Sequence, residues 1–377
     1  MESYGELGSG PAPRLVSDTS PISPRFADVG QKWDWASKAI KYVAETHSWM
    51  DDFGDNFAPK MIESRKLFAR AVVAAFAPDE EPDPGISFPD LAGDSPYFED
   101  ANVAVKLGWM ATTPDGRFEP EAPMTLVTTY RALVKSLPLD AEEAALADLH
   151  TSDGYYFETP ASFPTTELGM RLYLRYNHPN EGKDVEPKQP LPRAEVAYAL
   201  WRTATLDSWE VDGMAPFQTI ELPPLSTKMR KVVEWGTEYV GYPYIWGGEW
   251  HKKTKAGYCC GGQPGGGFDC SGLMWWLMKR PAGGYNNARM RDYNGWSLPQ
   301  RTSATMATGN HVGWGETRPG DLFFYDGDGH GGIDHVDLYI GNGWALDSSS
   351  GAGGVSILRV SSGWYRDHFV RARHLAG

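Results

Sequence analysis

The stretch GFDCSGLMWWLM, residues 267–278, decides how the second half of this 377-residue chain folds. A glycine-rich loop ends at Asp269, and nearly every residue from Leu273 to Met278 is apolar, which is typical of a helix buried in a core. Cys270 therefore lies where the loop becomes the helix. The first-turn N–H groups and the positive end of the helix dipole stabilise a thiolate there, so we expect a reactive cysteine. Because an inert core cysteine fits the same pattern, this interpretation also needs a base.

The candidate base is His335, which lies in the segment GIDHVDLYIGNG, residues 332–343. Side chains alternate along this segment, and it ends at a Gly-Asn-Gly turn, so it is predicted to be a strand of a hairpin. A cysteine on a helix, followed well downstream by a histidine on a strand, is the order of the papain-like arrangement.

The length of the turn decides which residue can hold the imidazole ring. If residues 341–343 form a three-residue loop, Asp337 lies opposite Asp347, and His335 becomes the diagonal neighbour of Asp347 on the same face. A two-residue turn at residues 342–343 would shift the register by one and turn Asp347 to the other face. Asp334 suits the role less well, because adjacent strand residues point to opposite faces.

Four motifs in order resemble the NlpC-type cysteine peptidases, a bacterial cell-wall branch of the papain-like fold. They are GYPYIWGG at 241–248, FDCSG at 268–272, RPGDLFF at 318–324 and the segment from His335 to Gly343. The resemblance runs from about Leu222 to the C-terminus. It implies an α+β domain of helices and an antiparallel sheet over residues 227–377. It also implies that Cys270 is the nucleophile and His335 the general base, with Asp347 where the family usually has histidine, asparagine or glutamine.

The resemblance further implies a function. The implied substrate is the stem peptide of peptidoglycan, which the family most often cuts between D-glutamate and the following diamino acid. The implied reaction needs no cofactor. Tyr244, Asp269 and Ser271 match family positions near the nucleophile and the substrate cleft. An N-acyl amidase of the same fold and a catalytically inactive, wall-bound structural protein are the alternatives.

The first half of the chain contains a repeat of about sixty residues, each copy a helix, a turn rich in glycine and aspartate, and a second helix. The copies span residues 24–80, 86–140 and 141–205. They resemble S-layer homology modules, which implies an all-α pseudo-trimer that grips an anionic secondary polymer of the cell wall. Residues 1–23 are expected to be an N-terminal extension and residues 206–226 a linker.

An arginine at the start of the second helix supplies the polymer contact in that family. Arg65 and Arg193 keep it, whereas the second copy reads Thr125-Leu126 and lacks it. An arginine fork suits a carboxylate or phosphate. The alternative is that both arginines form salt bridges at helix starts or between modules.

Composition excludes some partners. A net charge of −14 argues against nucleic acid, and no apolar run approaches the roughly 20 residues of a membrane span. No apolar stretch of signal-peptide type occurs in the first 25 residues. By resemblance, we expect a secreted or wall-associated protein. The role of Cys259-Cys260 within the glycine-rich insertion at 249–267 is open.

No metal site is predicted. Asp326, Asp328 and Asp334 resemble part of a calcium loop, but ligands at its remaining positions are missing. The three cysteines with His251 lack the paired spacing of a zinc site.

Overall fold

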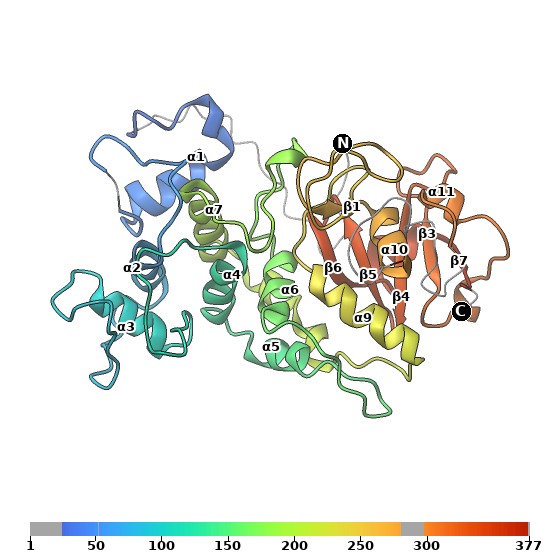
Figure 1. Cartoon of the computed structure of the whole chain (residues 1–377), viewed down its shortest axis with the longest axis horizontal. Coiled ribbons are helices and arrows are strands. Elements are labelled where there is room, and N and C mark those ends of the chain that lie inside the picture. Colours follow the sequence, from blue (N-terminus) through green and yellow to red (C-terminus); the bar gives the residue numbers. More distant parts are fainter. Residues whose placement is uncertain (1–24, 52, 280–297, 376–377) are drawn as a thin grey trace.

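The computed structural model of the chain describes residues 25–51, 53–279 and 298–375. The predicted α+β fold is confirmed: helices make up the first part, and helices with an antiparallel sheet make up the second (Figure 1). The N-terminal extension expected at residues 1–23 lies outside the described residues. No helix in the described ranges is long and apolar enough to cross a membrane.

The helical part runs from η1 to η4. Its elements are η1 (Gln31–Trp33), α1 (Asp34–Ile40), η2 (Lys41–Thr46), α2 (Arg65–Phe76), α3 (Phe98–Lys106), α4 (Leu126–Lys135), α5 (Asp140–Ala147), α6 (Phe163–Arg171), η3 (Glu181–Lys183), α7 (Arg193–Ala204), α8 (Ser208–Asp212) and η4 (Ala215–Thr219). The last two fall in the expected linker, where Phe217, Ile220 and Leu222 are buried. That segment therefore packs against the rest of the molecule.

The second part is built around a five-stranded antiparallel sheet in the order β6-β5-β4-β3-β7. Its strands are β3 (Leu322–Tyr325), β4 (His335–Gly341), β5 (Trp344–Ser349), β6 (Gly354–Arg359) and β7 (Phe369–Arg373). The remaining elements are α9 (Thr227–Tyr239), β1 (Glu249–Trp250), β2 (Gly267–Phe268), α10 (Cys270–Lys279), α11 (Ser303–Met306), η6 (Trp314–Glu316) and α12 (Gly363–Asp367).

The turn between β4 and β5 differs from the three-residue loop on which the predicted register depended. Asn342 and Gly343 alone form it, both with positive φ, and Gly341 pairs with Trp344. A bulge then shifts the register between Tyr339 and Gly341, so that Leu338 lies opposite Leu346. One pair further along, this register sets Asp337 opposite Asp347. The bulge thus restores the predicted pairing.

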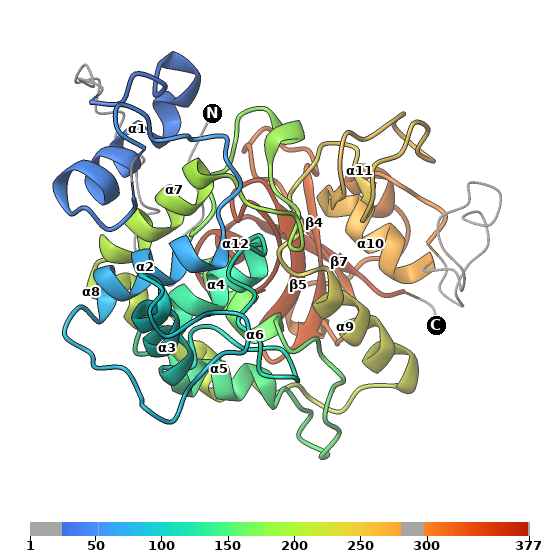
Figure 2. The same cartoon turned by 60° about the vertical axis from the view of Figure 1, so that its left-hand side comes forward.

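Helix α10 packs against β4 and β5, and α9 lies beside it (Figures 1 and 2). Every side chain of α10 is buried, in keeping with its apolar sequence. The helix contributes one wall of the core, and its first residue is Cys270. Fold and nucleophile position are therefore fixed by the same element.

Backbone contacts in the helical part repeat from one copy to the next. The Asp28 carboxylate accepts the N–H of Phe57 at 2.9 Å, and Asp90 accepts that of Phe118 at 2.8 Å. The arginine at a helix start then reaches the carbonyl of the same phenylalanine. Arg193 Nε lies 3.0 Å from the Phe57 oxygen, and Arg65 Nε lies 2.7 Å from the Phe118 oxygen.

The third such joint differs, because α4 begins with Leu126 in place of arginine. The corresponding loop carbonyl, that of Val185, accepts instead from Arg175 Nη1 at 3.0 Å. The same nitrogen donates to Gly241 of the second part at 2.9 Å. Gly241 has φ +91°, and a Cβ on it would lie 2.6 Å from a methyl carbon of Thr166. The joint that lacks the arginine is therefore filled by the second part of the chain.

Helix α6 covers the edge strand β6, and Figure 1 shows it between the other helices and the sheet. The Glu167 carboxylate accepts the Ile357 N–H at 2.9 Å, and the Asn177 amide donates to the Ser350 carbonyl at 2.8 Å. A sheet edge otherwise offers unpaired N–H groups to other chains. The Glu167 contact satisfies one N–H of that edge, and both contacts tie the two parts together.

Candidate active site

The structure brings Cys270, His335 and Asp347 together from three elements. Cys270 is the first residue of α10 and is a buried free thiol. The Cys270 and His335 side chains interact, and this interaction raises the pKa of His335. On the other side of the ring, His335 Nε2 lies 3.0 Å from Asp347 Oδ1. Because Nε2 faces Asp347, Nδ1 is the ring nitrogen available to the thiol.

The His335–Asp347 contact is an ion pair and lacks the alignment of a hydrogen bond. Asp347 is fully buried, whereas 13% of the His335 side chain is exposed. Burial alone would lower the pKa of His335, but the charge of Asp347 and the contacts with Asp347 and Cys270 raise that pKa well above its usual value. The other carboxylate oxygen of Asp347 accepts the Tyr365 hydroxyl at 3.0 Å. This environment favours an imidazolium beside the cysteine.

Asp269 and Ser271 flank the nucleophile and share a buried partner, Arg301. The Arg301 guanidinium reaches Asp269 Oδ1 at 3.1 Å, Oδ2 at 3.2 Å and the Ser271 hydroxyl at 2.8 Å. Its Nε lies 2.9 Å from a Glu249 carboxylate oxygen. Asp269 also accepts the Gly272 N–H, which caps the start of α10. The predicted cleft residues thus fix the first turn of the nucleophile helix.

Sequence reasoning missed Arg301. It lies 32 residues after Asp269 in the chain, in the segment LPQRTS at 298–303, and no periodicity links the two positions. Helix α10 also approaches the preceding turn very closely. A Cβ on Gly272 would lie 1.9 Å from the Gly248 carbonyl oxygen, so only glycine fits there.

Tyr244 is half-buried on the segment that leads to this turn. Its N–H donates to the Gly353 carbonyl at 3.3 Å, and it forms an isolated parallel bridge with Phe268. Phe268 is two residues before Cys270. Tyr244 therefore lies on the loop beside the nucleophile.

The insertion at residues 249–267 folds back on the site. Cys259 and Cys260 form a disulfide, and Gln263 bonds the backbone of Glu249 and Trp250. Glu186, from the helical part, accepts the Gly266 N–H at 2.7 Å. The helical part therefore borders the insertion next to the nucleophile.

The acidic loop at residues 326–334 does bring three carboxylates close together. Asp326, Asp328 and Asp334 each offer an oxygen within 4.8 Å of the others. Backbone N–H groups already occupy them: Asp334 accepts from Gly327 and Asp328, and Asp326 accepts from Gly331. These contacts order the loop.

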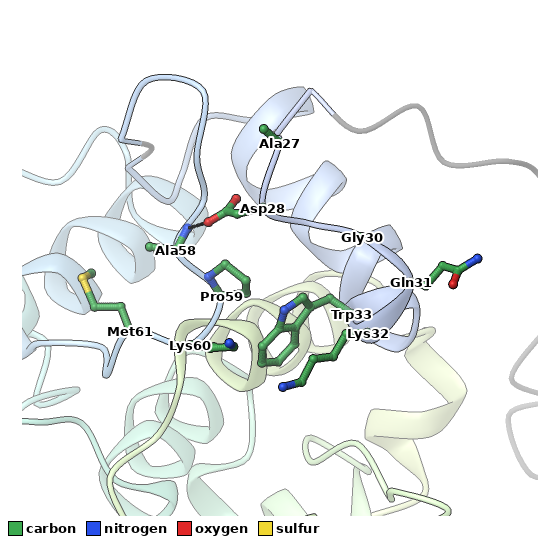
Figure 3. Close-up of a pocket in the computed structure, with 10 residues that line it drawn as sticks. All are labelled: Ala27, Asp28, Gly30, Gln31, Lys32, Trp33, Ala58, Pro59, Lys60 and Met61. Atoms are coloured by element: carbon green, nitrogen blue, oxygen red, sulfur yellow. Dashed lines mark hydrogen bonds between the residues drawn. The ribbon is translucent and has the colours of Figure 1, made fainter.

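The two predicted polymer arginines lie inside the helical part. Arg193 is fully buried, bonds Glu63 at 2.9 Å and reaches the Asp51 carbonyl. Arg65 is partly buried and donates to Ala111 at 2.6 Å as well as to Phe118. Next to the start of the Arg193 helix is an open cavity of about 530 Å³ (Figure 3). Its lining residues are Ala27, Asp28, Gly30, Gln31, Lys32, Trp33, Ala58, Pro59, Lys60 and Met61.

A cysteine at a helix start, with a histidine and an aspartate on adjacent antiparallel strands, resembles the arrangement of a papain-like cysteine hydrolase. Comparison with known sequences finds two family matches. Residues 241–374 match the NlpC/P60 family, and residues 87–126 match the S-layer homology domain. Both matches fall in the parts of the chain where the sequence motifs predicted these two families.

Several curated relatives are named as peptidoglycan endopeptidases or gamma-D-glutamyl peptidases. The chain is 35% identical over 121 residues to the peptidoglycan endopeptidase RipB of Mycobacterium tuberculosis, covering 32% of this chain and 43% of RipB. It is 29% identical over 143 residues to the gamma-D-glutamyl-L-lysine dipeptidyl-peptidase of Bacillus subtilis, covering 38% and 39%. The solved structure of the Mycobacterium tuberculosis RipB is 28% identical, covers 39% of this chain and 64% of that chain, and has a TM-score of 0.28. The chain spans less than half the length of these curated relatives.

Proposed function

We propose that this protein hydrolyses amide bonds in peptidoglycan stem peptides, with Cys270 as nucleophile, His335 as base and Asp347 as the group that orients the base. The bond between D-glutamate and the following diamino acid is the proposed target. The observation that carries the proposal is the buried chain of contacts from Cys270 through His335 to Asp347. The named activities of the relatives agree with it.

In the proposed mechanism, the imidazolium of His335 holds the Cys270 thiolate, which attacks the scissile carbonyl carbon. Backbone N–H groups at the start of α10, that of Cys270 included, stabilise the oxyanion by roughly 3–4 kcal/mol. His335 protonates the leaving amine, and the acyl group remains on sulfur as a thioester. The neutral imidazole then takes a proton from water, which hydrolyses the thioester and restores the thiolate.

Tyr244 on the adjoining loop is the proposed contact for the stem peptide. Asp269 and Ser271 are committed to Arg301, so we propose that they hold the nucleophile in place. Any contact of Asp269 with a substrate amine would compete with this buried ion pair. Arg301 thereby becomes part of the proposed site as a positioning residue.

We also propose that residues 24–205 are three S-layer homology modules and that they hold an anionic polymer of the cell wall, placing the protein at the cell surface. The match at residues 87–126 supports this. Arg193 is fully buried and already paired with Glu63. The open cavity with Lys32, Lys60 and Trp33 is therefore the better candidate for the contact with the polymer. Lysines supply charge for an anionic group, and an indole face suits a sugar ring.

The test is to incubate the full chain and its Cys270→Ala variant with purified muropeptides and to identify the products by mass. Release of a fragment that starts at the diamino acid, by the wild type alone, is expected. A product in which the whole peptide leaves the glycan would assign an N-acyl amidase instead. Unchanged substrate with the wild type would favour the inactive, structural alternative.

A further inference from the structure

A second carboxyl group, that of Asp337, lies beside the proposed site and has no part in the mechanism above. Asp337 is on β4, two residues after His335 and therefore on the same face of the strand. Its side chain is 0% exposed. The Tyr325 hydroxyl donates to Oδ2 at 2.7 Å, and Oδ1 has no hydrogen-bond partner among the described residues. A buried carboxyl with one free oxygen calls for a physical explanation.

The β4–β5 register provides the neighbour. Leu338 lies opposite Leu346, so the next pair is Asp337 and Asp347. Side chains of directly opposite residues start about 4.5–5.5 Å apart at Cβ. Two carboxyl groups this close and out of contact with water cannot both carry a charge. Burial and the charge of Asp347 raise the pKa of Asp337 well above its usual value, so the proton resides on Asp337.

Among the groups around the Asp337–Asp347 pair, His335 is the one that supplies a positive charge. Tyr325 from β3 and Tyr365 from α12 present hydroxyl groups, and burial raises the pKa of both phenols well above the usual value. Arg171 interacts electrostatically with Tyr365, and within the described residues it forms no ion pair with Asp337 or Asp347. The charge of Asp337 would also act on His335, as the electrostatic contact between them shows.

We propose that Asp337 and Asp347 act as one unit that carries a single negative charge beside His335, with Asp337 as a positioning residue that holds the unit's proton. When Asp347 is neutralised, Asp337 remains buried but loses the repulsion from the charge of Asp347, and the charge of His335 then favours its ionised form. It then releases its proton to solvent and supplies the charge that stabilises the imidazolium. The inference rests on the proposed Cys270–His335 site and names a residue of that site that sequence motifs do not assign.

A double-mutant cycle tests this unit. In the full chain, Asp347→Asn is expected to lower kcat/KM on muropeptides by about ten-fold relative to the wild type, and Asp337→Asn by about three-fold. The double variant is expected to lose more than the product of these two effects, with kcat/KM lower than that of the wild type by several hundred-fold or more. The rate of Cys270 alkylation by iodoacetamide is measured against pH for the same variants. Its acid limb is expected to move upward by about one pH unit in the double variant and less in either single variant, because an imidazolium without a carboxylate stabilises the thiolate less.

Purely structural roles would change thermal stability but would leave the alkylation profiles superimposed. If Asp347→Asn alone matches the double variant in both activity and alkylation, Asp337 supplies no charge and the proposal is wrong. Should Asp337→Asn fail to fold, Tyr325→Phe takes its place, and it is expected to reduce activity more in the Asp347→Asn background than in the wild type. Equal reductions in the two backgrounds would also overturn the proposal. Separated alkylation profiles without muropeptide cleavage would retain this inference and reject the proposed substrate.

Discussion

Arg175 Nη1 lies 2.9 Å from the Gly241 carbonyl oxygen and 3.0 Å from that of Val185, so one buried guanidinium joins the helical part to the turn that leads to the nucleophile. Its other terminal nitrogen bonds the Gly353 carbonyl. Hydrogen bonds from a charged donor contribute about 1.5–3 kcal/mol each when buried. The position of the peptidase part on the helical part therefore depends strongly on this residue.

Arg175→Ala is expected to destabilise the chain by about 3 kcal/mol or more, since three carbonyl groups lose a charged donor. Thermal unfolding measures the loss. Hydrogen exchange should also become faster at the backbone of residues 241–243 and 353–355. Arg131→Ala, an exposed position on α4, is the matched control and should change neither. Equal stability of the two variants would show that the interface does not depend on Arg175.

Arg301→Met removes a buried guanidinium and leaves Asp269 and Glu249 as unpaired buried carboxylates. The expected cost is about 3–5 kcal/mol of unfolding free energy, measured in urea. Activity should fall as well, because Asp269 and Ser271 flank Cys270. Arg318→Met serves as control, as its side chain is largely exposed and 3.9 Å from its partner Asp321. Wild-type stability with Arg301→Met would contradict the assigned role.

Glu167 predicts a pH dependence of stability. Burial raises its pKa to about 8 from an ordinary value of 4.5, against smaller opposing effects of the Ile357 N–H and Arg171. The folded chain therefore binds the Glu167 proton more tightly than the unfolded chain. The resulting stabilisation is complete below about pH 4.5 and is lost as the pH rises through about 8. Its size is on the order of a few kcal/mol.

Glu167→Gln should remove this contribution. The melting temperature of the wild type is expected to fall more steeply between pH 5 and pH 8 than that of the variant, on the order of several degrees. Differential scanning calorimetry at constant ionic strength measures both. Parallel curves for the two proteins would mean that Glu167 does not titrate in this range.

Lys60→Glu tests the cavity of the helical part. Reversing a charge on its lining should weaken retention on cell walls by about ten-fold or more, if the polymer is anionic. The matched control is Lys188→Glu, because Pro187-Lys188 corresponds to Pro59-Lys60 in the loop at the joint that Gly241 fills. Co-sedimentation with walls, before and after removal of the secondary polymer, is the measurement. Equal retention of both variants would exclude this cavity as the binding site.

In the β4–β5 hairpin, neither the alternation of side chains nor the length of the turn fixes the register of the two strands. Alternation along residues 335–341 identified the strand, but turn length alone left two registers open. The structure uses the two-residue turn, which by itself would turn Asp347 away, and then a bulge that brings it back. A bulge depends on packing against neighbouring strands, and short-range sequence carries little trace of it.

The sequence by itself determined the α+β class, the NlpC-type motifs, the helix that begins at Cys270 and the strand that begins at His335, because hydrophobic periodicity and turn residues act over a few positions. Only the tertiary structure decided what Arg301 and Arg175 contact, where Arg193 is buried and how Asp337 meets Asp347. These contacts join residues 10 to 178 positions apart. Their partners are selected by burial, where an unpaired charge costs several kcal/mol, and burial is a property of the whole fold.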